Sequence, residues 1–413
     1  MQSLLVFGRQ PELGIAELES LYGANKLLPL TDQAALVDVD PCLLNFDRLG
    51  GSVRFCKVLT KLPPQDWPSL KQFLIEIAPK QSVNMPAGKM YLGLSLIGFK
   101  LSPKEINALG FKLKQAISAT KRPVRYIPNK SLMLSSAQVI HNKLLSTNGW
   151  ELVIIKTASS IVIAQTIKVQ DIAAYSKRDY GRPKRDSQVG MLPPKLAQMI
   201  INLAAGRLPE DLSQSICDIP PDQLVPFKTI DKVVLDPFCG TGVLLQEALL
   251  MGYRVYGTDL NQRMIDYTNF NLYEWLLPKH PEIEANIKTE IGDAKNHVWQ
   301  QPIDFIASET YLGQNFNQIP APGILDNELK KTNQMISQFL KNLAPQLKPN
   351  SRLCLAVPAW QIAPNQFRYL PLIDQIPALG YNQVSFKHTG SDNLVYYRPD
   401  QIVARQLLIL TRK

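Results

Sequence analysis

The stretch from Val233 to Val243, Val-Val-Leu-Asp-Pro-Phe-Cys-Gly-Thr-Gly-Val, constrains the fold more than any other part of the chain. Three apolar residues lead into Asp236 and Pro237, and a Gly-Thr-Gly turn and an amphipathic helical pattern follow. This order predicts a buried parallel strand, a tight glycine loop and a helix. Because Gly240 and Gly242 lack a Cβ atom, a ligand can lie on the backbone beside the free N–H groups of the helix start. We therefore expect a cofactor-binding loop, and a βα turn without a ligand is the alternative.

The position of Asp236 indicates which class of cofactor this loop holds. A dinucleotide site would carry Gly-x-Gly-x-x-Gly, with pyrophosphate at the helix N-terminus. A carboxylate directly before the glycines would repel pyrophosphate, but it suits a ligand with an amino acid moiety and a positive centre. S-adenosylmethionine fits that description. Cys239, inside the loop, is interpreted as a small packing residue rather than a nucleophile.

Two further carboxylates follow predicted strands. Asp259 closes the second strand, 254–259, and follows Asp236 by 23 residues, close to the roughly 20 expected for a carboxylate that binds a ribose diol. Asp293 follows the third strand, 287–291, where it can meet the adenine edge. Each acid alone is more often a helix cap or a turn residue. Three at successive strand ends favour a ligand site, because open α/β sheets bind ligands at the carboxyl ends of their parallel strands.

The fourth strand, 303–307, leads into Ser308-Glu309-Thr310-Tyr311. Enzymes that methylate exocyclic amino groups carry Asp/Asn/Ser-Pro-Pro-Tyr/Phe at this point. Ser308 and Tyr311 match that pattern, whereas Glu309 and Thr310 replace both prolines and remove the stiffness that prolines give a loop. We predict that Ser308 or Glu309 orients a target amine and that Tyr311 stacks on its base. A slow, altered or inactive site remains the alternative.

Composition narrows the possible partners and compartments. The chain has 413 residues, 45% of them hydrophobic, enough for two or three domains, and its net charge of +10 favours a polyanionic partner. Five scattered cysteines and four distant histidines predict no metal site and no disulfide framework, which indicates a reducing compartment. No apolar run of 18 residues occurs, so we expect a cytoplasmic protein without a membrane span.

Two basic regions are candidates for RNA contact. The first region, 100–130, carries one acid among its cations, and the second, 177–186, lies just before the predicted glycine-loop domain. A solvated helix face or a charged linker explains each region equally well. The candidate RNA-binding residues are Lys112, Lys114, Lys121, Arg122, Arg125, Arg178 and Arg182.

The first half reads as alternating strands and helices, with prolines at 63, 64 and 68 as a junction. The expected strands there are 4–7, 34–39, 55–59, 91–98, 124–127, 151–157 and 160–166, and the expected helices are 12–22, 43–49, 103–113 and 137–144. Downstream we expect a helix over 194–205, a loop over 206–228, a fifth strand over 352–357 and a terminal pair over 383–387 and 402–411.

Taken together, these stretches resemble the archaeal-type tRNA guanosine-10 N2-methyltransferases, which carry a THUMP domain. The run Met-Leu-Pro-Pro-Lys-Leu-Ala at 191–197, joined to the loop at 236–242, is specific to that family among RNA methyltransferases. The other resembling segments are 4–13, 141–145, 178–183, 257–259 and 292–294.

The resemblance implies an α/β chain with a ferredoxin-like domain at 1–65, a THUMP-like domain at 66–170, a basic linker at 171–189 and a methyltransferase domain at 190–413. The last would hold a Rossmann-like seven-stranded sheet. Family motif positions place S-adenosylmethionine at Asp236, Gly240, Gly242, Asp259 and Asp293. They place the target guanine of a tRNA at Tyr311. Some members need a small activating subunit, and the sequence leaves that requirement open.

Two other functions stay open at this point. One is methylation of another RNA amino group on the same fold. The other is RNA binding by a protein whose catalytic site is degenerate, for which the Ser-Glu-Thr-Tyr sequence is the motivating feature. Three carboxylates at successive strand ends favour an enzyme over the second alternative.

Overall fold

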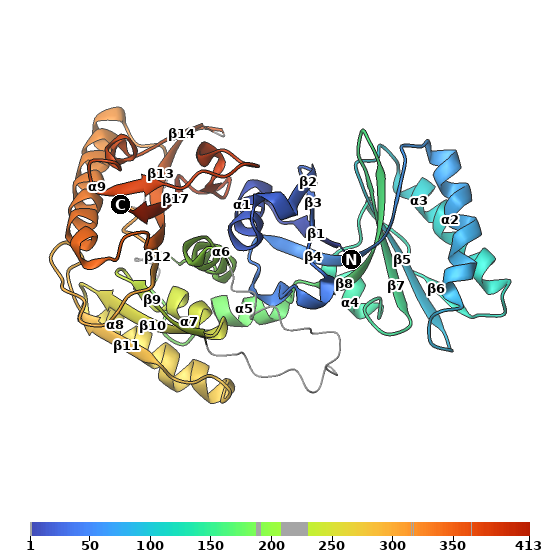
Figure 1. Ribbon diagram of the computed structural model, residues 1–413, viewed down its shortest axis with the longest axis horizontal. Helices are drawn as coiled ribbons and strands as arrows, with labels where there is room; N and C mark the ends of the chain where they lie inside the picture. Colours follow the sequence, from blue (N-terminus) through green and yellow to red (C-terminus); the bar gives the residue numbers. More distant parts are fainter. Residues whose placement is uncertain (1, 187–190, 208–229, 315, 317, 365) are drawn as a thin grey trace. The chain divides into compact units, whose positions relative to one another are not determined.

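The computed structural model describes residues 2–186, 191–207, 230–314, 316, 318–364 and 366–413, and these form two compact units (Figure 1). Unit 1 contains the residues up to Pro11, Asn25–Asp47 and Ser52–Asp171. Unit 2 contains Glu12–Ala24, Arg48–Gly51 and Ile172–Lys413. The N-terminal segment is therefore shared between the two units.

Unit 1 is built on one eight-stranded sheet with the order β2-β3-β1-β4-β8-β7-β5-β6. Its strands are β1 (Ser3–Phe7), β2 (Leu27–Thr31), β3 (Ala34–Val37), β4 (Ser52–Leu62), β5 (Met90–Ile97), β6 (Val124–Tyr126), β7 (Gly149–Lys156) and β8 (Ile161–Val169). Its helices are α2 (Trp67–Ser82), α3 (Pro103–Ser118) and α4 (Ser136–His141). Apolar residues of α2 and α3 pack on alternate residues of β5 and β7 and form the main core of this unit.

A buried polar network crosses the sheet of unit 1. Arg54 on β4 pairs with Glu151 on β7, and its Nη1 donates to Ser95 on β5 at 3.0 Å. Thr166 on β8 donates to the other Glu151 oxygen at 2.6 Å. Arg54 belongs to the predicted ferredoxin-like domain and Glu151 to the THUMP-like one. The structure thus groups both in one sheet, and the division near residue 65 remains a prediction.

Unit 2 is built on a second sheet with the order β11-β10-β9-β12-β13-β17-β15, and β14 and β16 pair at its margin. Its strands are β9 (Ile230–Asp236), β10 (Tyr253–Asp259), β11 (Ile287–Ile291), β12 (Phe305–Glu309), β13 (Arg352–Ala363), β14 (Gln366–Arg368), β15 (Tyr381–Gln383), β16 (Val395–Tyr396) and β17 (Val403–Arg412). Its helices are α1 (Pro11–Tyr22, of which Pro11 groups with unit 1), α5 (Ile172–Tyr180), α6 (Pro194–Ala205), α7 (Val243–Leu250), α8 (Gln262–Asn269), the π-helix η6 (Phe270–Leu276) and α9 (Pro322–Leu343).

This strand order sets the place of the site. Strands β11, β10, β9, β12 and β13 run parallel, and β17 is antiparallel to β13. The chain leaves β9 toward β10 on one side and returns to β12 on the other, so the sheet has its topological switch point between β9 and β12. Open α/β sheets bind ligands beside such a point. Among the described residues this sheet has nine strands rather than the expected seven, because β14 and β16 pair beside the seven strands of the path.

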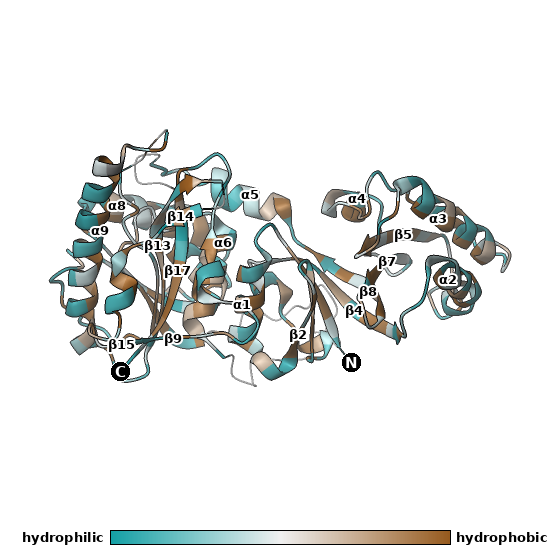
Figure 2. Ribbon diagram, turned by 90° about the horizontal axis from the view of Figure 1, so that it is seen from above, coloured by the Kyte–Doolittle hydropathy of each residue, from teal (hydrophilic) through white to brown (hydrophobic). Residues whose placement is uncertain are grey.

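Helices cover both faces of this sheet. Helices α6 and α7, joined by Leu13 and Ala16 of α1, form the core on one face, and α9 forms it on the other. Strands β13 and β17 consist largely of hydrophobic residues, whereas much of α9 is hydrophilic (Figure 2). The resulting three-layer unit agrees with the predicted α/β class.

Several local predictions differ from the structure. The helix expected over 43–49 is wrong, because two 3-10 turns, Pro41–Leu43 and Phe46–Arg48, stand there. Helix α2 was not expected after the prolines, and Asp66 caps it by accepting from the Ser69 N–H at 2.8 Å. The last strand pair is shifted, since β15 ends at Gln383. The loop expected over 206–228 lies almost wholly outside the described residues.

The cysteines also differ in part. Cys56, Cys239 and Cys354 are buried free thiols, whereas Cys42 is disulfide-bonded, so the expectation of unpaired cysteines is wrong there. Across the described residues, no helix is long and apolar enough to span a bilayer. Nor do those residues bring three potential metal ligands together.

Candidate active site at the switch point

The glycine loop after β9 has left-handed backbone angles that suit glycine, in agreement with the tight loop that its sequence predicts. Gly240 and Gly242 have φ values of 52° and 82°, in the left-handed region that glycine adopts without penalty. A Cβ atom at Gly242 would lie 3.0 Å from the Thr268 side chain. The Thr268 hydroxyl donates to the Gly240 carbonyl at 2.8 Å, which holds the loop against α8.

Asp236 lies at the end of β9 and is only 2% exposed. Its Oδ1 accepts from the Ser308 hydroxyl at 2.5 Å and from the Phe238 N–H at 3.2 Å. Burial raises the pKa of Asp236 to about 7, against the opposing effect of the Ser308 hydrogen bond. The first and fourth strand ends are thus joined directly, as their predicted placement at one edge requires.

Asp259 and Asp293 lie at the ends of β10 and β11. The Asp259 carboxylate accepts from the Gly240 N–H at 3.0 Å and the Asn261 N–H at 2.9 Å, so it also shapes the glycine loop. Burial raises its pKa. Asp293 accepts from the Lys295 N–H at 3.1 Å and pairs with the Lys295 ammonium at 3.2 Å. Both carboxylates are half-buried, so both stay accessible to a ligand.

Cys239 packs inside the loop. It is 5% exposed, and a Cβ atom at Gly257 would lie 3.2 Å from its own Cβ. Burial raises its thiol pKa well above the ordinary value. A protonated, enclosed thiol agrees with the packing interpretation rather than with a nucleophile.

The end of β12 divides its side chains between the two faces of the sheet. Ser308 is fully buried on Asp236. Glu309 points toward β17, where Arg405 Nε donates to its Oε1 at 2.9 Å. Thr310 donates to the Ala356 carbonyl through both its N–H, at 3.0 Å, and its hydroxyl, at 3.2 Å. These two bonds pin the loop to β13 without either proline.

Tyr311 is the exposed aromatic group of this loop, with 54% of its surface accessible. The chain turns just beyond it at Gly313, where φ is 82° and a Cβ atom would lie 2.9 Å from Glu328 of α9. Glu328 accepts from the Gln314 N–H at 2.9 Å and anchors the far end of the loop. Tyr311 is therefore free to contact a planar group while both ends of its loop are held.

The segment 178–186 packs on the glycine loop. Arg182 is 3% exposed and donates to the Thr241 hydroxyl at 3.1 Å, and burial lowers its pKa to about 10. Arg178 pairs with the buried Glu247 of α7 at 2.9 Å. Asn271 of η6 donates to the carbonyls of Thr241, at 2.9 Å, and Lys184, at 2.8 Å. These contacts favour a role at the cofactor mouth, and RNA binding by the two arginines remains a prediction.

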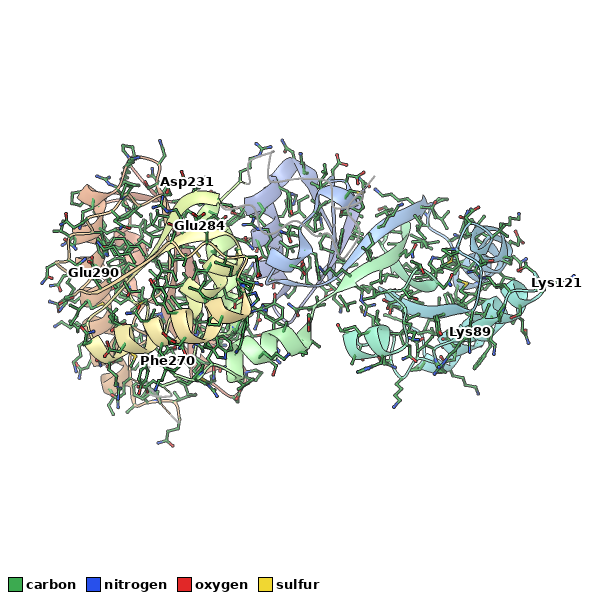
Figure 3. All side chains as sticks on the ribbon, turned by 90° about the horizontal axis from the view of Figure 1, so that it is seen from below. Lys89, Lys121, Asp231, Phe270, Glu284 and Glu290 are labelled. Atoms are coloured by element: carbon green, nitrogen blue, oxygen red, sulfur yellow. The ribbon has the colours of Figure 1, made fainter. Side chains whose placement is uncertain are left out.

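The basic candidates of unit 1 fall into two groups. Lys112, Lys121 and Arg125 are exposed, and Lys121 lies at one end of the unit (Figure 3). Arg122 is half-buried and donates to the carbonyls of Ser82, Met85 and Pro86. Lys114 is half-buried on α3. The three exposed cations are thus the better placed for phosphate contact.

Sequence reasoning missed three residues of this site: Glu247, Asn271 and Arg405. Each lies far along the chain from the motif that it contacts, and none belongs to a recognisable pattern. Asn271 lies in a π-helix, a rare element that is concentrated at functional sites, but this signal comes from the structure and not from the sequence.

Comparison with known proteins gives partial relatives. The tRNA (guanine(10)-N2)-dimethyltransferase of Methanothermobacter thermautotrophicus is 28% identical over 169 residues, 41% of this chain and 39% of that protein. The enzyme of the same name from Methanocaldococcus jannaschii is 27% identical over 159 residues, 37% of this chain and 39% of that protein. The aligned stretch thus spans about two fifths of either relative.

No protein-family model matches the sequence. Among solved structures, TrmN from Thermus thermophilus covers 100% of both chains with a TM-score of 0.48 and 14% identity. That likeness is too low to establish a shared activity.

Proposed function

We propose that this protein transfers a methyl group from S-adenosylmethionine to the exocyclic 2-amino group of a guanosine in tRNA, with position 10 as the expected target. The observation that carries the proposal is the meeting of four strand ends at one switch point. These strand ends and the loops that follow them carry three carboxylates, a glycine loop and an exposed tyrosine. The names of the partial relatives support the same substrate.

The residues present fit this cofactor. Asp236 and the glycine loop suit the amino acid part, and Asp259 and Asp293 suit the ribose and adenine ends. Leu260, 68% exposed, and Ile291, 53% exposed, stand beside those last two acids, where apolar side chains can flank a purine ring. When bound, S-adenosylmethionine supplies an electrophilic methyl group on a sulfonium centre.

The chain's own residues would then orient the target. Tyr311 stacks on the guanine, and the end of β12 accepts hydrogen bonds from its amine. Positioning supplies much of the rate, because attack on a reactive sulfonium in line needs little other assistance. The two bonds of Thr310 to β13 give the loop the order that two prolines would otherwise provide.

The test is methyl transfer from labelled S-adenosylmethionine to an unmodified tRNA transcript, followed by nucleoside analysis and mapping of the labelled position. The expected product is N2-methylated guanosine at position 10. Label at another nucleotide would support a different RNA methyltransferase. Cofactor and tRNA binding without any transfer would support the RNA-binding alternative, for which the missing prolines are the motivating feature.

Cofactor binding has its own test. Asp259→Ala should weaken S-adenosylmethionine binding by about tenfold or more in calorimetry, because a hydrogen bond to a charged group contributes about 1.5–3 kcal/mol. The exposed Asp231, which pairs with Arg254, offers a control in Asp231→Ala. Full binding by Asp259→Ala would refute the ribose assignment.

A further inference from the structure

We propose that Arg405 is a positioning residue that holds the Glu309 carboxylate as the acceptor for the substrate amine. The inference rests on the proposed function and deepens it. It assigns the acceptor role within the Ser-Glu-Thr-Tyr segment to one residue and names the group that orients it.

The first step concerns Ser308, whose hydroxyl oxygen is enclosed and out of reach of a substrate. It is fully buried, and its hydroxyl hydrogen is donated to Asp236 at 2.5 Å. A target amine would have to open the contact between β9 and β12 to reach it. Ser308, in the first position of the motif, therefore serves to join β9 and β12.

The second step concerns the two oxygens of Glu309, whose side chain is 13% exposed. Arg405 donates to Oε1 at 2.9 Å. Among the described residues Oε2 has no hydrogen-bond partner, and it is not one of the enclosed unpaired atoms. One oxygen is thus held by β17, while the other keeps its acceptor capacity at the carboxyl end of β12.

The third step concerns the rigidity of Arg405. It lies on β17 opposite Pro358 of β13, while Glu309 lies opposite Ala356 of the same strand. The guanidinium therefore reaches Glu309 across β13 from a regular antiparallel pair. Its Nη1 also donates to Gln401 at 3.3 Å, and the side chain is 8% exposed. A guanidinium held at two points has little freedom, so it fixes the carboxylate more firmly than a mobile ammonium would.

The chemistry assigned to this pair is balanced. The nitrogen–methyl bond forms as the sulfur–methyl bond breaks, and the bonding pair remains on sulfur, which becomes a neutral thioether. The amine then gives up one proton, for which Glu309 is the acceptor before solvent. A hydrogen bond to the carboxylate also keeps the nitrogen lone pair directed at the methyl group.

The experiment measures kcat and KM for tRNA with the full chain. Glu309→Gln should lower kcat by about 100-fold or more. Arg405→Met should lower it by about 10- to 100-fold with KM nearly unchanged, since a small misplacement of a reacting group has effects of that size. Arg405→Lys should restore part of the loss. Arg368→Met, which breaks an exposed pair between β14 and Asp326 of α9, is the matched control and should keep full activity.

The double variant separates positioning from a general structural effect. Because Arg405 acts through Glu309, Glu309→Gln with Arg405→Met should be no slower than Glu309→Gln alone. Multiplied losses would overturn the inference, as would an Arg405→Met protein with wild-type kcat. If Arg405→Met does not fold, Gln401→Ala replaces it and should lower kcat by a smaller factor. A wild-type chain that transfers no methyl group would overturn this inference and the proposed function together.

Discussion

Asp236 is the residue at which folding and function compete most directly. Its carboxyl is 2% exposed at the end of a core strand, and burial raises its pKa to about 7 from the ordinary 3.8. A carboxyl whose pKa is raised by folding binds its proton more tightly in the native state. It therefore stabilises the fold below the ordinary pKa, and that contribution is lost as pH rises toward 7.

Asp236→Asn should remove this pH dependence, since an amide oxygen can still accept from Ser308. Each pKa unit corresponds to about 1.36 kcal/mol. As the pH rises from 5 to 8, the free energy of unfolding of wild type should therefore fall by about 2–3 kcal/mol relative to that of the variant. Urea denaturation at the two values measures it. Asp231→Asn, at an exposed carboxylate labelled in Figure 3, is the control and should follow wild type. The same change in the free energy of unfolding between the two pH values for all three proteins would contradict the prediction.

At the scale of elements, the most consequential feature is helix α1. Its residues from Glu12 group with the switch-point sheet, and Glu17 accepts from the Gly50 and Gly51 N–H groups, each at 2.9 Å, and from Asn202 of α6 at 2.7 Å. Leu13 and Ala16 complete the apolar core under α6. Unit 2 is thus discontinuous in sequence and needs the N-terminal segment for its own core.

Leu13→Ala should therefore destabilise unit 2, although the residue lies more than 200 positions before the glycine loop. Large-to-small changes in a core cost about 2–5 kcal/mol, and Leu13 is fully buried. The same change at Leu43, which is 37% exposed, should cost less than about 1 kcal/mol. Urea denaturation of both variants gives the comparison, and equal costs would mean that α1 does not carry the core.

At the scale of the whole molecule, the net charge of +10 belongs to unit 1, because unit 2 carries as many acidic as basic residues, and only part of this charge is available to a polyanion. Arg178 and Arg182 are engaged beside the glycine loop, and Arg122 ties three backbone carbonyls together. The exposed cations of α3 and its surroundings remain for phosphate contact. We therefore expect the long-range attraction of tRNA to depend more on the exposed cations of unit 1 than on Arg178 and Arg182.

Replacement of Lys112, Lys121 and Arg125 by glutamine should weaken tRNA binding by about tenfold or more. It should also make the slope of log binding constant against log salt concentration shallower by roughly 0.7–0.9 for each lost phosphate contact. Binding measured at several salt concentrations gives both quantities. The matched control replaces three exposed lysines of α9, Lys330, Lys331 and Lys341, which should leave the slope unchanged. A fall in affinity equal to that of the control would exclude unit 1 as the docking surface. S-adenosylmethionine binding should be unaffected in both proteins.

Local patterns along the chain were enough to predict several parts of this protein. An apolar run ending in Asp-Pro and Gly-Thr-Gly predicted β9 and its loop, and acids after the next two runs predicted Asp259 and Asp293, because parallel strands bring their carboxyl ends to one edge. Tertiary structure decided which side chains meet there. Glu309 and its partner Arg405 are 96 residues apart. Their pairing depends on β13 lying between β12 and β17, and strand order is a property of the packed sheet that no local spacing encodes. The same holds for α1, whose amphipathic pattern predicted a helix but not the sheet on which it packs.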